Sequence, residues 1–270
     1  MKTRILTLII FSITLFVILS PKGGARTIFF ADFETGSRKA KPSPAVNKPE
    51  NWKPENPQTK WTIGDFKNGT KALKQLTEGC AASGNTPLPE LKGNYFTNGI
   101  IQLEMSAGDD DSWGVVLRKS GEKKGYLVVF GVNETPAVIV ALLDKGCADV
   151  GKCLDQSGCE NNPANTLIQV PHGMGAMDQT NNTIYFGRVE AIGDTIRVWY
   201  LKRDDVKDPN AKDLGKPIAE VKDSTHKSGA VGIWHETMSN SMIDNVLVDT
   251  GLAVDTEGKL ATTWGVLKQY

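Results

Sequence analysis

Short apolar segments separated by turn residues recur along the chain from residue 71 to residue 249. They are rich in Val, Ile, Tyr, Phe and Trp, and Gly, Asn, Asp and Pro punctuate them, which is typical of β-strands joined by turns. The stretches between them show no helical stripe. The pattern predicts an all-β fold, a two-sheet antiparallel jelly-roll sandwich, and excludes a parallel α/β sheet. The segments read KALKQL, GIIQLEM, WGVVLR, GYLVVFGV, AVIVALL, NTIYFGRVEAI, TIRVWYL, IAEV, GAVGIWH and MIDNVLVD.

Two hairpins are predicted within this pattern. Gly193 and Asp194 form a turn between two alternating strands, so that one face of each strand can be dry and the other wet. The residues GEKK join WGVVLRKS to GYLVVFG, and these two arms carry aliphatic residues at nearly every position. Such continuous apolar runs predict central strands that are covered on both faces.

The two ends of the chain differ from this body. Residues 1–25 combine Lys2 and Arg4, a short apolar run and small residues ending at Ala25, which predicts a secretory signal peptide; an uncleaved membrane anchor is the alternative. Residues 26–250 are the predicted sandwich, and residues 251–270 form a C-terminal tail. The sandwich contains a proline-rich loop at 38–60, which can be neither a helix nor a central strand.

Charge limits the choice of partner. The chain has 31 basic and 31 acidic residues, and removing residues 1–25, which contain Lys2, Arg4 and Lys22, leaves 28 basic residues. Nucleic acid needs a concentrated basic surface, so we expect no nucleic-acid partner. A membrane is expected as a partner only if the N-terminal segment stays attached. The protein is therefore expected to be secreted or to lie in the cell envelope.

Four cysteines, an even number in a chain that is expected to be exported, predict disulfides. They are Cys80, Cys147, Cys153 and Cys159, and three connectivities remain open. Zinc is a weaker alternative, because five residues separate successive cysteines in CADVGKCLDQSGC. We interpret residues 144–180 as a long loop held by these bonds.

Three consecutive acids, Asp109, Asp110 and Asp111, directly precede the most strand-like run of the chain. Adjacent carboxylates repel one another unless a cation offsets the repulsion, and calcium accepts hard oxygen ligands in irregular loops. The alternative is a solvated turn, because exposed charges in water repel only weakly. We predict a calcium site here.

The order of several segments resembles concanavalin A-like lectin and laminin-G-type jelly rolls. These segments are FFADFE, KALKQ, DDDSWGVVLR with GYLVVFGV, YFGRVEAIGDTIRVWY and SGAVGIWHETMSNSMIDNVLVD, and they look closest to the lectin-like C-terminal module of thrombospondins. The resemblance implies a two-sheet antiparallel sandwich that holds calcium and binds sugars or matrix proteins. The proline-rich loop, the cysteine cluster and the absence of acid-rich calcium repeats depart from that family.

In jelly rolls of this type the first and last strands run side by side, which would bring Asp32 and Asp244 together. We predict a second calcium site at this pair; alternatively, Asp244 and the following Asn kink the strand and cap its backbone groups. Trp234 and His235 lie at a strand end, where an aromatic ring and a histidine form a candidate sugar-stacking surface. Burial is the alternative for both: Trp234 sits in an apolar strand and is most simply a core residue, and His235 is then a buried histidine with satisfied hydrogen bonds.

Sequence patterns for catalysis are absent. The glycosidase spacing E-x-D-x-x-E does not occur, and the strand IIQLEM offers only Glu104. We therefore expect an exported, calcium-stabilised, non-catalytic binding module for a glycan or an extracellular or envelope protein. The alternative is a glycan-active hydrolase or lyase on the same scaffold, whose acids come together only in space.

Overall fold

A computed structural model of the chain describes residues 28–34, 47–67, 69–88, 96–143, 149–154, 164–236, 238–250, 253–254 and 260–261. The predicted signal peptide, Cys147, Cys159 and most of the C-terminal tail lie outside these residues. Within the described part of the chain, no helix has both the length and the apolar character needed to cross a membrane.

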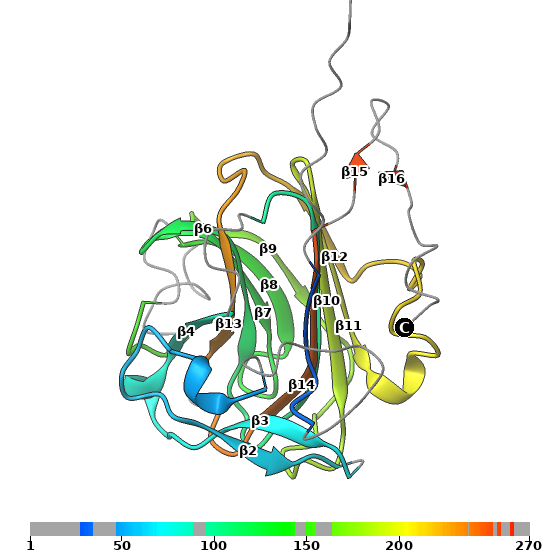
Figure 1. The fold of residues 1–270 in the computed structure, drawn as a ribbon. Coiled ribbons are helices and arrows are strands. Elements are labelled where there is room, and N and C mark those ends of the chain that lie inside the picture. The colour runs from blue at the N-terminus through cyan, green and yellow to red at the C-terminus, as the bar shows by residue number, and fades with distance from the viewer. Residues whose placement is uncertain are drawn as a thin grey trace, which may run out of the picture.

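Two antiparallel sheets face each other as a sandwich (Figure 1). The eight-stranded sheet has the order β12-β11-β10-β5-β14-β3-β2, with β1 also paired to β14. Its strands are β1 (Ile28–Ala31), β2 (Trp61–Asp65), β3 (Lys71–Gln75), β5 (Gly99–Ser106), β10 (Tyr185–Ile192), β11 (Thr195–Lys202), β12 (Ala219–Lys222) and β14 (Met242–Asp249).

The six-stranded sheet has the order β4-β13-β6-β7-β8-β9. Its strands are β4 (Gly84–Pro87), β6 (Trp113–Gly121), β7 (Lys124–Phe130), β8 (Ala137–Leu142), β9 (Thr166–Pro171) and β13 (Ala230–His235). Two short strands near the C-terminus, β15 (Ala253–Val254) and β16 (Leu260–Ala261), pair only with each other. The predicted all-β, two-sheet antiparallel sandwich is confirmed.

Both predicted hairpins are present. β10 and β11 pair in full register around Gly193, whose φ of 58° is the left-handed conformation that suits a glycine at a tight turn. β6 pairs with β7, with a register shift after Leu117 where Arg118 has a φ of 51°. The first and last long strands, β1 and β14, also run side by side, as the family resemblance implied.

The core fills the space between the two sheets with alternate residues of each strand. β5 contributes Ile101, Leu103 and Met105, all at most 1% exposed. The proline-rich loop adds Trp52, which is 2% exposed and packs with its ring centroid 5.4 Å from that of Phe33. Burial of these apolar surfaces is the main stabilising term of the sandwich.

The outer face of the six-stranded sheet is buried as well. A second apolar cluster covers β6, β7 and β8 there, and Leu154 packs onto it from the following loop. The disulfide between Cys80 and Cys153 ties this loop to the short 3₁₀ turn η2 (Cys80–Ala82). Coverage on both faces explains why the strands read as continuous apolar runs, as predicted.

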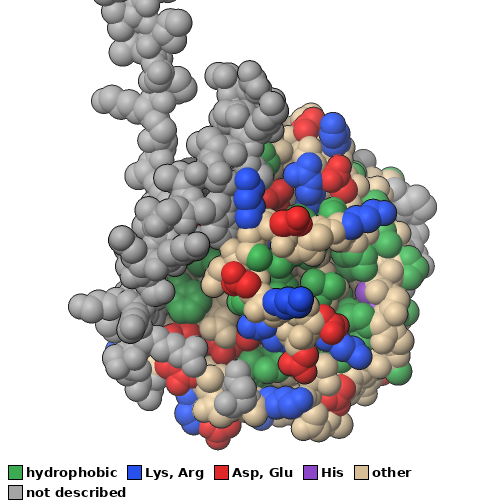
Figure 2. All heavy atoms as spheres, turned by 90° about the vertical axis from the view of Figure 1, so that its right-hand side faces the viewer, with side chains coloured by type: hydrophobic (Ala, Val, Ile, Leu, Met, Phe, Trp, Pro, Cys, Tyr) green, Lys and Arg blue, Asp and Glu red, His purple; other side chains and the backbone are tan. Residues whose placement is uncertain are grey.

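The segment 203–217 covers part of the outer face of the eight-stranded sheet, over β10 and β11. Arg188 on β10 is 4% exposed and donates to the carbonyl of Ala211 at 2.8 Å, while Trp199 Nε1 donates to the carbonyl of Gly215 at 2.9 Å. Figure 2 shows basic and acidic side chains interspersed over this side of the molecule. The expected wet face of the β10–β11 hairpin is present only near the turn, where Arg197 exposes 35% of its side chain beside Glu190, because a long connection folds back over the rest.

Candidate functional site

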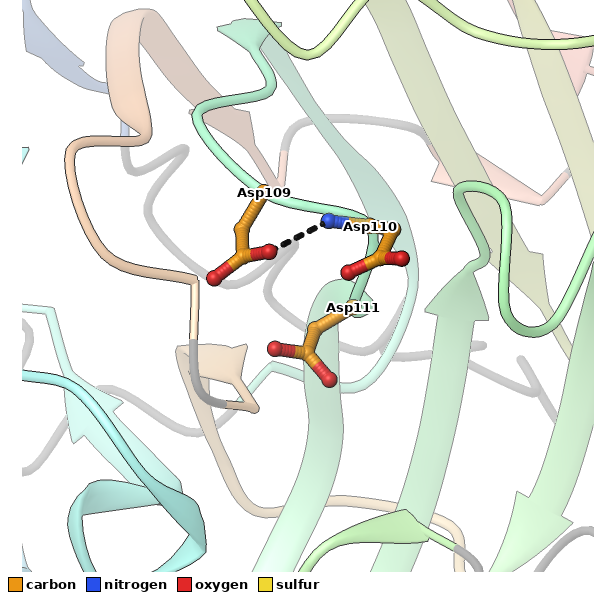
Figure 3. A group of neighbouring side chains, drawn as sticks. All are labelled: Asp109, Asp110 and Asp111. Atoms are coloured by element: carbon orange, nitrogen blue, oxygen red, sulfur yellow. Dashed lines mark hydrogen bonds between the residues drawn. The ribbon is translucent and has the colours of Figure 1, made fainter.

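The three consecutive acids lie in the loop between β5 and β6, at one rim of the sandwich. One ligand oxygen from each of Asp109, Asp110 and Asp111 falls within 4.8 Å of the others, and Figure 3 shows their carboxylates gathered around the same turn. Asp109 Oδ1 accepts a hydrogen bond from the backbone N–H of Asp110 at 2.9 Å. No other group of three or more acidic, His or Cys side chains in the described residues is as compact.

Neighbouring turns hold this loop in place. The Gly108 N–H donates to Ser241 Oγ at 3.0 Å, and the carbonyl of Asp110 accepts from the N–H groups of Asn133 and Glu134, each at 3.0 Å. An added Cβ on Gly108 would lie 2.4 Å from the carbonyl oxygen of Ser239, so this position needs a glycine for close approach. The acids therefore sit on a loop that is fixed at three points.

No described basic side chain neutralises the negative charge of the three acids at the rim. Asp111 is 8% exposed, and burial, followed by Glu236 and Glu134, raises the pKa of its carboxyl to about 8. Burial also raises the pKa of Asp109. None of the ion pairs formed by described residues involves these three acids. The alternative of a solvated turn does not fit Asp111, because its carboxyl is removed from water and lies near other acids.

Glu236 is a rim residue that sequence reasoning missed. It is 4% exposed, and its Oε2 accepts from the Ser112 N–H at 3.2 Å while its Oε1 accepts from the Leu154 N–H. It thus connects the acidic loop to the disulfide-linked segment 149–154. No local motif marks this position, because its partner Ser112 is 124 residues away in the sequence.

The donor set fits calcium. Carboxylate oxygens are the hard ligands that calcium prefers, and a bound divalent cation would remove the repulsion that raises the pKa of Asp111. Asp109 and Asp110 remain partly exposed, which leaves an approach for the ion from solvent. The carboxylates of Asp109, Asp110 and Asp111 are the side chains that we assign to this candidate site, and Glu236 holds the loop beside them.

The second predicted calcium pair has a different environment. Asp32 and Asp244 are 2% and 1% exposed and are close enough for Asp32 to raise the pKa of Asp244. Protein donors already occupy their oxygens: Asn47 Nδ2 donates to Asp32 Oδ1 at 3.0 Å, and the Asn245 N–H donates to Asp244 Oδ1 at 2.7 Å. Asn245 has a φ of 50°, and the register of β14 shifts there. This geometry matches the alternative interpretation, in which Asp244 and Asn245 kink the strand.

Replacing Asp244 by Asn is expected to flatten the pH dependence of stability. Burial, then Glu104 and Asp32, raise the pKa of Asp244 to about 8 from 3.8. The folded state therefore holds this proton more tightly than the unfolded state, so stability falls as the pH rises from about 4 to about 8. At pH 8 the Asp244→Asn variant should be more stable than the wild type by about 1–2 kcal/mol, measured by urea denaturation.

The matched control is Asp65→Asn at an exposed position on β2, where Lys71 lowers the pKa of the acid. That variant should keep the wild-type slope between pH 5 and pH 8. Equal slopes for Asp244→Asn and the wild type would show that Asp244 is ionised in the folded protein.

Trp234 and His235 do not form the predicted stacking surface. Their exposures are 0% and 1%, so neither ring offers a face on which a sugar could stack. His235 contacts Gln75 Nε2 through Nδ1 at 3.0 Å and meets the ring of Trp61 edge-on at 5.2 Å, and burial lowers its pKa to about 4. His235 is thus a buried neutral histidine with hydrogen-bond partners, which was the alternative interpretation.

A pair of carboxylates does meet in space, as the enzymatic alternative requires. Glu104 on β5 lies directly opposite Asp244 on β14. Both are buried, Arg203 Nε donates to Glu104 Oε1, and Asn245 Nδ2 donates to Glu104 Oε2 at 3.0 Å. Neither acid lines either of the two depressions described next.

Two shallow depressions mark the described surface. One, of about 600 Å³, lies beside the outer side of β4, β13 and β6 and is lined by Asn85, Lys119 and Val150 among others. The other, of about 510 Å³, lies beside β2 and is lined by Trp61 and Leu76 among others. The two large apolar side chains that are exposed among the described residues, Leu76 at 51% and Val150 at 45%, line one depression each.

Comparison with known proteins gives distant structural similarity alone. No protein-family model matches the chain, and no curated protein sequence matches it. Among solved structures, the carbohydrate-binding module CBM66 from Bacillus subtilis is similar at 13% identity and a TM-score of 0.44, covering 73% of this chain and 93% of its own. The exoplasmic/lumenal domain of VIP36 in its Ca2+/Man2-bound form is similar at 10% identity and a TM-score of 0.43, covering 85% and 89%.

A galectin from Caenorhabditis elegans, LEC-6, is also similar, at 13% identity and a TM-score of 0.34, with 62% of this chain and 89% of its own covered. The resemblance to the thrombospondin module finds no support among these structures. At these values the similarity gives no information about the ligand of this chain.

Proposed function

We propose that the protein is an exported, calcium-stabilised binding module that captures glycans without cleaving them. Calcium is held at the rim by the Asp109–Asp111 loop, which Glu236 fixes through the Ser112 N–H. The ion is structural, because it fixes the loops at one end of the sandwich. The disulfide between Cys80 and Cys153 supports the export part of the proposal, since such bonds persist in oxidising compartments.

One observation carries this proposal: the buried carboxylate of Asp111 lies among four other acids and has no ion pair with a described basic side chain. Ionising this carboxyl without a partner is unfavourable in the folded state, which is why its pKa is raised to about 8, and a bound cation offsets that cost. The rim is thereby coupled to the segment 149–154 through Glu236.

Capture is favoured over turnover by where the acids lie. Glycosidic cleavage needs two carboxyls flanking an accessible bond, and the facing pair Glu104 and Asp244 is buried under hydrogen bonds. The two depressions are shallow and each has an exposed apolar side chain, Leu76 or Val150, which suits contact with the apolar face of a sugar ring.

A glycan array combined with an assay for released reducing ends tests this proposal. Wild-type protein in calcium should be retained on at least one polysaccharide and release no reducing ends, and EDTA should weaken the retention. Release of reducing ends from the retained polysaccharide would support the hydrolase instead. Retention on no glycan would overturn glycan capture and leave an extracellular protein as the partner to seek.

A further inference from the structure

We infer that the depression on the outer side of β4, β13 and β6 is the glycan site, and that Asn85 and Trp234 bind a hydroxyl of a neutral sugar there. This inference rests on the proposed glycan-binding function and assigns it a surface and a ligand class. Below, "the outer groove" means this depression together with the small cavity at its floor.

Two buried polar atoms at the floor of the outer groove lack a partner in the described part of the chain. They are the acceptor Asn85 Oδ1 and the donor Trp234 Nε1, in residues that are 6% and 0% exposed. The two residues face each other in register across β4 and β13. A buried acceptor and a buried donor side by side match a hydroxyl group, which donates to one and accepts from the other.

The backbone leaves room for this pair. Gly232 lies two residues before Trp234 on the same face of β13, and Asn85 Oδ1 lies 2.4 Å from the place where a Cβ on Gly232 would be. Any side chain at Gly232 would therefore displace the amide of Asn85. The glycine allows the amide to lie flat over the strand at the floor of the outer groove.

The cavity that Asn85 and Trp234 line has a volume of about 30 Å³. A cavity needs roughly 10–15 Å³ to admit one water-sized group, so it can take a hydroxyl but not a sugar ring. It shares Glu55, Lys119 and Val150 with the depression of about 600 Å³. A ring can thus rest in the depression against the exposed Val150 while one hydroxyl reaches down to the pair.

Charges around the outer groove favour a neutral ligand. Lys119 is paired with Glu55, and Lys123 is paired with Asp149 at 3.1 Å, so both described lysines of the lining are already neutralised. Glu122 adds a further negative charge. An anionic glycan such as a uronate polymer would meet no free cation among the described lining residues and would be repelled by Glu122.

Native affinity electrophoresis in calcium tests the inference, with gels containing dextran, galactomannan, arabinoxylan or alginate. We expect wild-type protein to be retarded by at least one of the three neutral polymers and not by alginate. Asn85→Leu, which removes the acceptor at similar volume, should weaken binding about tenfold, and Trp234→Phe, which removes the donor, should weaken it by a similar factor.

Trp113→Phe is the matched control, because Trp113 is a buried tryptophan of the same sheet that faces the core instead. It should bind as the wild type does. If Asn85→Leu and Trp234→Phe also bind within twofold of the wild type, the outer groove is not the site, although glycan capture stands. Retardation by alginate alone overturns the neutral-ligand assignment, and retardation by no glycan on any gel overturns the proposed function itself.

A second measurement needs no substitution and covers the case of a misfolded variant. In ¹⁵N-labelled wild-type protein, the indole N–H resonance of Trp234 should shift when oligosaccharides of the retarding polymer are added, while that of Trp113 stays in place. An unshifted Trp234 resonance at saturating oligosaccharide would overturn the assignment.

Discussion

Loss of the Cys80–Cys153 disulfide is expected to lower the free energy of unfolding by about 4 kcal/mol, because the bond closes a long loop in the unfolded chain. The two cysteines are 73 residues apart, and the bond ties η2 to the segment 149–154. At about 2–4 °C per kcal/mol for a chain of this size, the melting temperature should fall by about 8–16 °C. Calorimetry of the Cys80→Ser/Cys153→Ser double variant measures this.

The same variant should also bind glycan more weakly than the wild type, since Val150 in the wall of the outer groove lies in the tethered segment. Adding reductant should change its melting temperature less than it changes that of the wild type. A double variant that melts within about 2 °C of the wild type would show that apolar packing of Leu154 alone holds the segment in place.

Calcium is expected to raise the melting temperature of EDTA-treated protein by about 5–10 °C at a concentration near one hundred times the dissociation constant. The ion binds the folded rim and not the unfolded chain, so its binding free energy adds to stability. At a pH above the raised pKa of its carboxyl, Asp111→Asn should melt at a higher temperature than the metal-free wild type, because the amide removes a buried charge from among the acids. It should gain little from added calcium.

Asp244→Asn is the matched control for this experiment, because it neutralises another buried acid outside the rim. It should keep the full response to calcium. A wild type that does not respond to calcium would remove the ion from the proposal. A response retained in Asp111→Asn but lost in Asp244→Asn would move the ion to the pair of Asp32 and Asp244.

The architecture could be predicted because it depends on local pattern. Turn residues between strongly apolar strands specify the hairpins, and the continuous apolar run of β7, where Tyr126 to Phe130 are all buried, indicates coverage on both faces. The Asp109–Asp111 group could also be predicted, because its members are adjacent in the chain. Both the sandwich architecture and the acidic group could be predicted because they depend on residues that are close together in the sequence.

The remaining features depend on contacts between distant segments. For Trp234 and His235 the sequence left a stacking surface and burial both open, and the packing of Trp61 and Leu154 against them decides for burial. Glu236 joins the rim through Ser112, 124 residues away, with no motif to mark it. The interpretation of Asp32 and Asp244 as a metal pair did not include Asn47, whose amide donates to Asp32. The alternation of apolar and polar residues along a strand does not predict which hydrogen-bond donors the loops supply.

Isothermal titration of EDTA-treated protein with calcium tests the central claim most directly. One ion should bind per chain in the wild type and in Asp244→Asn, and Asp111→Asn should show no binding heat. Absence of binding heat in the wild type, together with an unchanged melting temperature, would contradict a calcium-holding rim.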